Sequence, residues 1–267
     1  MTILSPTQID AVDRLLRDVA RDIVMPRFQN LTADQVKEKA ADDLVTIADQ
    51  ESEERLSAEL VRILSDSTVV GEEACAADPS VQDRIGDGAV WIIDPIDGTG
   101  NFAAGRAPFG LMVALAVEGE VHAGWMFDPL GDRMCHARLG EGAFIDGARV
   151  RSRGSGADVP IAGISMLFMD QDKRAHIIER AGGKLTMADI PRCAAEQYPR
   201  IVLGQNDMAL FERTLPWDHA PGVLFLNEAG GAALRADGTP YRVTDRRTGL
   251  LGAATPALWE MGARILF

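Results

Sequence analysis

The segment WIIDPIDGTGNF, residues 91–102, carries the strongest structural signal in the sequence. Its apolar start continues Ala89 and Val90 and predicts a buried strand. That strand is expected to end at Pro95, because proline has no N–H to donate to a strand ladder. Asp97-Gly98-Thr99 then predicts a tight turn. Asp94 and Asp97 therefore leave one strand end together.

Such a pair of carboxylates can surround a hard cation, and the backbone carbonyl of Ile96 can supply another oxygen. Mg²⁺ prefers an all-oxygen environment completed by water and phosphate. The N–H groups of Gly98 and Thr99 are candidates for binding a phosphate oxygen, especially if a helix begins there. An ordinary Asx turn is the simpler alternative. The DxDGT motif of haloacid-dehalogenase-type phosphatases fits less well, because two residues separate the aspartates here.

Three further stretches place acidic side chains at the ends of predicted elements. The strand-like segment 69–73 ends on Glu72 and a second glutamate, whose repulsion a nearby cation would relieve. Asp49 lies seven residues before Leu56, on the inward side of a helix predicted from Thr46. Asp218 stands where another helix begins. The simpler explanations are a solvated acidic loop, a carboxylate favoured near a helix N-terminus and a helix cap.

The rest of the chain predicts alternating helices and strands. Ser5 to Gln8 is typical of a helix start with a capping box, and residues 111–150 are typical of an antiparallel meander. Beyond them we expect strands at 161–164 and 201–203, and helices at 172–181, 216–229 and 256–266. This order predicts a layered α+β sandwich. The polar run 151–156 predicts a boundary between an N-terminal half, 1–150, and a C-terminal half, 151–267.

The chain has 267 residues and a formal net charge of −13. A surface of this sign repels nucleic acid and anionic membranes, so we expect neither as a partner. It would also repel a phosphate ester, so a phosphate site needs local positive charge, which a bound metal ion can supply. Three widely spaced cysteines predict free thiols in a reducing environment. We find no signal-peptide core or spanning segment, and expect a cytoplasmic protein.

Taken together, these segments resemble the inositol monophosphatase family of Mg²⁺-dependent, lithium-sensitive phosphatases. The family pattern is DLVT-x-x-D, GEE, W-x-x-DPIDGT-x-NF and a WD-x-A-x-G helix that ends in EAGG. The corresponding segments occur in the same order at residues 43–49, 71–73, 91–102 and 217–231. The resemblance implies a five-layer αβαβα sandwich of the inositol monophosphatase and fructose-1,6-bisphosphatase type, usually dimeric. It implies two or three Mg²⁺ ions, held by Glu72, Asp94, the Ile96 carbonyl, Asp97 and Asp218.

The resemblance also implies the remaining roles and the reaction. The attacking water would be oriented and activated by Asp49, Glu72 and Thr99. The substrate would be bound by Gly98, Thr99, Ala194, Glu212 and Asp218. The best-guess reaction is hydrolysis of inositol monophosphate to inositol and phosphate. The alternatives are histidinol phosphate, fructose 1,6-bisphosphate and 3′-phosphoadenosine 5′-phosphate, or a catalytically silent binding or regulatory module.

Two departures from the family pattern fall on the expected substrate side. Glu212 stands one residue closer to the WD motif than the usual spacing. The segment 192–196, RCAAE, occupies the place of the family's small-residue G-[ST]-A-A turn. Arg192, Cys193 and Glu196 are the unexpected residues there. These departures weigh against strict inositol specificity.

Overall fold

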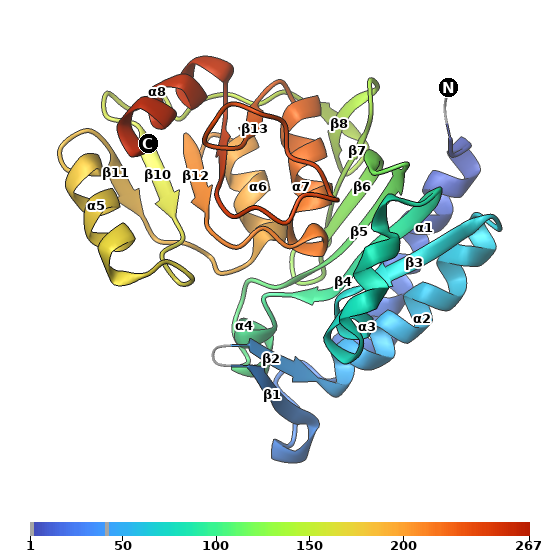
Figure 1. The fold of residues 1–267 in the computed structure, drawn as a ribbon. Helices are drawn as coiled ribbons and strands as arrows, with labels where there is room; N and C mark the ends of the chain where they lie inside the picture. The colour runs from blue at the N-terminus through green and yellow to red at the C-terminus, as the bar shows by residue number, and fades with distance from the viewer. Residues whose placement is uncertain (1–2, 41–42) are drawn as a thin grey trace.

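The computed structural model describes residues 3–40 and 43–267 and folds into five layers (Figure 1). Helices α1 (Pro6–Val19) and α2 (Ile47–Ile63) cover one face of a seven-stranded sheet. Helices α6 (Ala194–Val202) and α7 (Pro216–Glu228) lie between that sheet and a five-stranded sheet. Helices α5 (Gln171–Ala181) and α8 (Pro256–Leu266) form the fifth layer. The predicted αβαβα sandwich is confirmed.

The first helical layer begins where the sequence predicts. The side chain of Ser5 accepts from the Gln8 N–H, and the side chain of Gln8 accepts from the Ser5 N–H, which completes the capping box. Thr46 caps α2 in the same way. Leu56 and Leu60 are fully buried against the large sheet, so the helical period correctly identified the inward face. A π-helical turn (Ala20–Val24) extends α1, and a 3₁₀ turn (Ala33–Gln35) precedes the first strand.

The seven-stranded sheet runs in sequence order from β3 to β9. Its strands are β3 (Ser67–Gly71), β4 (Ala89–Asp97), β5 (Gly110–Val117), β6 (Glu120–Asp128), β7 (Arg133–Arg138), β8 (Gly142–Ile145) and β9 (Ala148–Val150). β3 is parallel to β4, and every later pair is antiparallel. The predicted meander is therefore confirmed. Between β3 and β4 lie α3 (Glu72–Ala77) and a 3₁₀ segment (Pro79–Gly86), and α4 (Thr99–Ala103) follows β4.

The prediction that β4 ends at Pro95 is wrong, because the strand continues to Asp97. The pairing of β3 with β4 extends as far as Gly71 opposite Ile93. Past that point β4 pairs with β5, and the register shifts between Asp94 and Asp97. A proline is tolerated where a strand has one neighbour and an irregular register, since no ladder bond requires its missing N–H.

The five-stranded sheet has the order β11-β10-β12-β14-β13. Its strands are β10 (Ile161–Ile164), β11 (Thr186–Ala188), β12 (Met208–Phe211), β13 (Ala232–Leu234) and β14 (Leu250–Ala253). The predicted strand at 201–203 is wrong: Ile201 and Val202 form the last turn of α6, and the strand comes later, at β12. A short apolar run does not distinguish a buried helix turn from a buried strand.

Strand direction in this small sheet determines where its loops meet. β10 is parallel to both β11 and β12, so the carboxyl ends of all three reach one edge, where open α/β sheets bind ligands. A two-stranded hairpin, β1 (Val36–Ala40) and β2 (Asp43–Thr46), lies beside α4 (Figure 1). The division at residue 150 stays a prediction: β9 ends there, but α6 and α7 of the second half pack against the first sheet. None of the described helices has the length and apolar character needed to cross a bilayer.

Candidate metal and phosphate site

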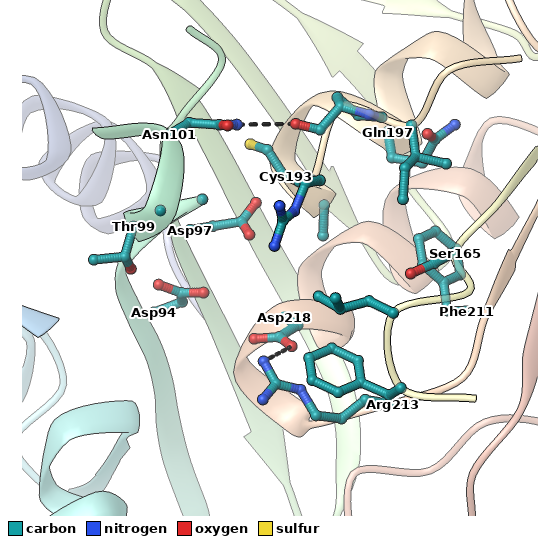
Figure 2. Close-up of a pocket in the computed structure, with 18 of the residues that line it drawn as sticks. Asp94, Asp97, Thr99, Asn101, Ser165, Cys193, Gln197, Phe211, Arg213 and Asp218 are labelled. Carbon is teal, nitrogen blue, oxygen red and sulfur yellow. Dashed lines mark hydrogen bonds and ion pairs between the residues drawn. The ribbon is translucent and has the colours of Figure 1, made fainter. Parts of the chain in front are cut away.

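A cavity of about 480 Å³ opens between the end of β4 and the carboxyl edge of the five-stranded sheet (Figure 2). The β1–β2 hairpin, α4 and the first turn of α7 complete its walls. Most of the predicted site residues line it: Glu72, Asp94, Ile96, Asp97, Gly98, Thr99, Ala194, Glu212 and Asp218. Asp49 is buried behind this wall. The topology thus gathers segments that are far apart in the sequence.

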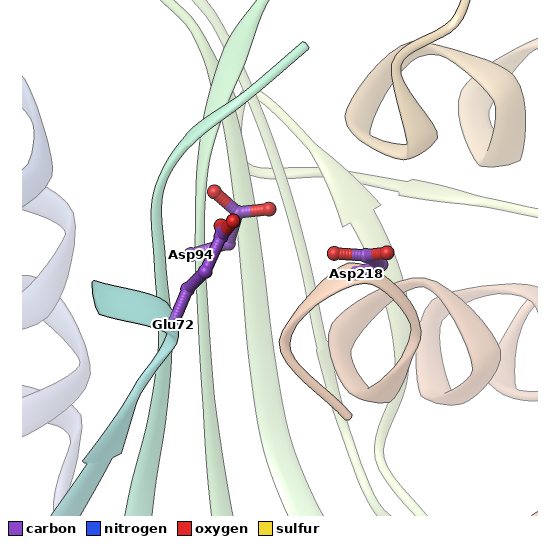
Figure 3. A group of neighbouring side chains, drawn as sticks. All are labelled: Glu72, Asp94 and Asp218. Atoms are coloured by element: carbon purple, nitrogen blue, oxygen red, sulfur yellow. The ribbon is translucent and has the colours of Figure 1, made fainter. Parts of the chain in front are cut away.

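Three carboxylates from three different elements form one group (Figure 3). Glu72 is the first residue of α3, Asp94 is in β4, and Asp218 is in the first turn of α7. One carboxylate oxygen from each lies within 4.8 Å of the others. Asp94 is buried, and among the described residues its Oδ1 has no hydrogen-bond partner.

This group fits a divalent cation. Burial, and then the neighbouring carboxylates of Glu72, Asp97 and Asp218, raise the pKa of Asp94 well above its usual value. Ionised carboxylates this close, and shielded from water, repel each other unless a positive charge lies between them. Carboxylate oxygens are also the ligands that Mg²⁺ prefers. The buried, unbonded Asp94 oxygen is therefore available to a metal ion.

Asp97 lies beside the group of three and also anchors α6. Its Oδ2 accepts a hydrogen bond of 2.6 Å from the Ala195 N–H, and the Cys193 thiol bonds to the same carboxylate. Burial raises the pKa of Asp97 to about 6, although these hydrogen bonds act in the opposite direction. Asp97 thus connects the end of β4 to the turn that precedes α6. Its role as a metal ligand stays a prediction.

Asp49 and Thr99, two of the predicted catalytic residues, are in contact. Thr99 Oγ1 lies 3.2 Å from Asp49 Oδ1 and 2.8 Å from the Ile96 carbonyl oxygen. The other Asp49 oxygen accepts from the Thr46 N–H at 2.8 Å and from the Thr46 hydroxyl at 2.6 Å. Burial raises the pKa of Asp49 to about 7 despite these bonds. A carboxylate of this pKa can accept or hold a proton near neutral pH.

Glu53 is a buried carboxylate at this site that the sequence reasoning missed. It accepts hydrogen bonds from the Glu73 N–H at 2.7 Å and the Ala74 N–H at 2.8 Å, and so fixes the first turn of α3 beside Glu72. A Cβ on Gly71 would stand 2.3 Å from Glu53 Cδ, which explains the glycine of the GEE motif. The signal was available, because Glu53 lies four residues after Asp49 on the same helical face.

Gly98 forms the turn between β4 and α4 with a left-handed backbone, φ +82°. A Cβ there would lie 3.1 Å from the Pro108 carbonyl oxygen and 3.2 Å from Cys193 Cβ. The Asn101 side chain donates to the carbonyls of Pro108 and Pro191 at 2.8 and 2.9 Å, as Figure 2 shows in part. The predicted phosphate-binding turn is thereby packed against the segment that leads into Arg192. Binding of phosphate by Gly98 and Thr99 stays a prediction.

The substrate side of the cavity contains contacts that the sequence did not reveal. Both carboxylate oxygens of Glu212 accept from Lys173 Nζ, at 2.8 and 2.7 Å. The Arg213 guanidinium carbon lies 4.1 Å from the centre of the Phe168 ring. Glu212 therefore reaches the cavity as half of an ion pair, and its contact with substrate stays a prediction. Ala194 lines the wall beside it.

A buried hydrogen-bond chain holds the backbone next to Glu212. Tyr198 Oη lies 2.8 Å from His219 Nδ1, and His219 Nε2 lies 3.0 Å from the Arg213 carbonyl oxygen. Burial lowers the pKa of His219 to about 3 and raises that of Tyr198 well above its usual value. The neutral ring therefore accepts from the tyrosine hydroxyl and donates to the carbonyl. Tyr198 and His219, to which the sequence analysis assigned no role, thus fix this part of the cavity wall.

Comparison with known proteins places this geometry in context. The model of the inositol monophosphatase family matches residues 5–266. An inositol-1-monophosphatase of Bacillus subtilis is 27% identical over 92% of each chain. A fructose-1,6-bisphosphatase/inositol-1-monophosphatase of Thermotoga maritima is 31% identical over 84% of this chain and 83% of its own. The crystal structure of extragenic suppressor protein suhB from Bartonella henselae superposes with a TM-score of 0.83, at 22% identity over 97% of this chain and 98% of that one, and so shares the fold.

Proposed function

The chain belongs to the inositol monophosphatase family, and from this premise we propose that it is a Mg²⁺-dependent phosphomonoesterase acting on a small phosphorylated polyol or sugar. One observation carries the proposal. The carboxylates of Glu72, Asp94 and Asp218 converge from three distant segments beside the Gly98 turn, in a cavity large enough for a small ester. In a protein of net charge −13, bound cations would supply the positive charge that this group of carboxylates needs to hold a phosphate ester.

Two or three bound Mg²⁺ ions would neutralise the phosphate, activate the attacking water and stabilise the leaving oxygen. The chain's own part is to hold these cations with Glu72, Asp94, the Ile96 carbonyl, Asp97 and Asp218. The N–H groups of Gly98 and Thr99 orient the phosphate. Substrate would also contact Ala194, Glu212 and Asp218, which line the same cavity.

Asp49, Glu72 and Thr99 would orient and activate the water, and a carboxylate among them would receive its proton. The Thr99 hydroxyl bridges Asp49 and the Ile96 carbonyl at 3.2 and 2.8 Å, so its position is fixed before substrate arrives. In the cation-free protein, burial raises the pKa of Asp49 to about 7, and its contact with Thr99 makes Asp49 the proposed acceptor of that proton. Burial raises the pKa of Cys193 well above its usual value and keeps that thiol protonated, so direct attack by water is favoured over a covalent cysteine intermediate.

Inositol monophosphate is the first substrate to test, and fructose 1,6-bisphosphate is the second. The names of the relatives from Bacillus subtilis and Thermotoga maritima support these two. Histidinol phosphate and 3′-phosphoadenosine 5′-phosphate complete the panel. We extend the proposal to inhibition by lithium and to a homodimer, both of which rest on family likeness, and to a cytoplasmic location.

The test is release of inorganic phosphate from these four compounds, each with Mg²⁺ and with excess chelator. The expected result is hydrolysis that requires the cation, with at least one compound clearly preferred. Absence of phosphate release from every compound in the presence of Mg²⁺ would favour a catalytically silent binding module. Lithium in the same assay tests the proposed inhibition.

A further inference from the structure

A bidentate ion pair stands at the carboxyl edge of the five-stranded sheet. Glu212 follows β12 and lines the cavity, and Lys173 is in the first turn of α5, which follows β10. Because β10 and β12 are neighbouring parallel strands, their carboxyl ends lie side by side, and the start of α5 reaches the residue that follows β12. Arg192 and Arg213 line the same cavity, on the loops after β11 and β12, and we call this part of it the arginine end.

The two charged groups of this pair are held at fixed positions. Lys173 Nζ donates to Glu212 Oε1 at 2.8 Å and to Glu212 Oε2 at 2.7 Å. The backbone N–H of Lys173 donates to the side chain of Asp170, which caps α5, and the Glu212 carbonyl accepts from the Gly249 N–H at 2.9 Å. An ion pair with two charge-assisted hydrogen bonds on a fixed backbone is formed before any ligand arrives.

Glu212 is the buried partner of the pair. Its side chain is 11% exposed, whereas that of Lys173 is 36% exposed. A carboxylate so shielded from water interacts strongly with any nearby charge, because its surroundings have a low effective dielectric constant. Without a partner, it would attract a cationic group of a ligand in the cavity. The fixed ammonium group of Lys173 cancels that attraction.

A neutralised carboxylate still accepts hydrogen bonds from neutral donors. The two oxygens of a carboxylate offer about four lone-pair sites, and Lys173 donates to each oxygen of Glu212. A hydroxyl group of an alcohol can therefore bond to Glu212 without any change in the net charge of this wall. An ammonium group would gain little there, because the negative charge of Glu212 is already balanced by Lys173.

We propose that Lys173 is a specificity-determining residue. By neutralising Glu212, it makes the cavity select substrates whose alcohol carries hydroxyl groups over otherwise identical substrates whose alcohol carries an ammonium group. The inference rests on the proposed function for the position of the phosphate, and it goes beyond that function by naming the chemical class that is rejected. Histidinol phosphate bears an amino group, so inositol monophosphate should rank above it.

The experiment compares glucosamine 6-phosphate with glucose 6-phosphate, which differ by one ammonium group in place of one hydroxyl. 2-Aminoethyl phosphate and 2-hydroxyethyl phosphate form a shorter pair. In the Lys173→Met variant the charge of Glu212 becomes available to the ligand. The ratio of kcat/KM for the amine to kcat/KM for the hydroxyl compound should therefore rise about tenfold in at least one pair, the gain of one charge-assisted hydrogen bond. Lys173→Arg keeps the positive charge and should keep the wild-type ratio.

Two controls show whether the effect runs through Glu212. Lys184→Met removes an exposed lysine outside the cavity lining and should leave the ratio unchanged. The double variant that combines Lys173→Met with Glu212→Gln should return the ratio toward its wild-type value. An unchanged ratio in folded Lys173→Met protein, or a rise that persists in the double variant, would overturn the proposal.

Absence of phosphate release from every compound, inositol monophosphate included, would count against the proposed function instead. Compounds that are not hydrolysed are compared by calorimetry in the presence of Mg²⁺. A preference for the hydroxyl compound that weakens in Lys173→Met would support the role of Lys173. Equal preferences in the two proteins, or absence of binding to both, would refute it.

Discussion

The acidic end of the cavity and its arginine end are built in different ways. At the acidic end, backbone N–H groups hold buried carboxylates by short hydrogen bonds. Glu53, for example, accepts from two N–H groups at the start of α3. At the arginine end, the exposed side chain of Arg192 and the half-buried side chain of Arg213 stand on the loops after β11 and β12. Under the proposed function, the cation site lies on strand ends and helix starts that pack in the core, whereas substrate contacts lie on loops that can change without disturbing it.

The largest effect is expected at the acidic end, from Asp94→Asn. The amide keeps the shape of the side chain but removes a charged ligand, so Mg²⁺-dependent phosphate release should fall by a factor on the order of 1,000 or more. The melting temperature without cation should stay the same or rise, because a buried charge is lost. Activity within a few-fold of wild type would contradict the assignment of Asp94 to the cation site.

Gly71→Ala tests how tightly the acidic end is packed. The added methyl group would stand 2.3 Å from Glu53 Cδ, so the carboxylate must move and its bonds to α3 must weaken. We expect a loss of about 1 to 3 kcal/mol in unfolding free energy, measured by denaturant titration. Gly100→Ala is the control, since a Cβ there meets nothing within 4 Å. Equal stability of the two variants would show that Glu53 is loosely held.

The pH dependence of stability in the absence of divalent cations gives a third test. Burial raises the pKa values of Asp49 and Glu53 to about 7, above their unfolded values near 4. Folding therefore favours the protonated forms, and the resulting stability is present below pH 4 and is lost as pH rises through 7. In chelator, the melting temperature should fall between pH 5 and pH 8.

Mg²⁺ should reverse much of that loss at pH 8, because a cation stabilises the ionised carboxylates of the folded state. The measurement is a pair of thermal melts at each pH, with and without Mg²⁺. A metal-free melting temperature that rises from pH 5 to pH 8 would contradict the proposal that ionisation of these buried carboxylates destabilises the folded state.

The smallest effect is expected at the arginine end, from Phe168→Ala. Phe168 is 40% exposed, so its loss should change the unfolding free energy by less than about 1 kcal/mol. Without the ring, the Arg213 guanidinium loses its stacking surface, and the KM for the substrate that the phosphate-release panel identifies should rise about threefold. Ile178→Ala, an exposed apolar residue on α5, is a suitable control for general surface effects. A shift in kcat alone would argue against a role in binding.

The sequence predicted the acidic end far better than the arginine end, for a physical reason. Asp94, Asp97 and Glu72 stand at the ends of short apolar strands, so local pattern alone fixes where their side chains emerge. Asp218 follows from a helix start in the same way. These signals are contained within a few residues, and the family pattern linked them into one site.

The arginine end depends on contacts that no local pattern records. Lys173 forms an ion pair with Glu212, and Phe168 stacks under Arg213. In both contacts, a residue that follows β10 packs against a residue that follows β12. The misplaced strand at 201–203 removed β12 from the predicted sheet, and with it the edge on which Arg213 lies. Arg192 was noticed as a departure, but its positive φ is visible only in the structure.

The bond between the Ala195 N–H and Asp97 has a thermodynamic consequence that concerns both ends at once. Ala195 lies three residues after Arg192, so this hydrogen bond connects the turn that contains the arginine to Asp97. In the proposed site, a cation held by Asp97 would share the carboxylate that accepts this hydrogen bond through its Oδ2. If metal occupancy changes the affinity for a ligand of this turn by some factor, linkage requires that the ligand change the affinity for the metal by the same factor.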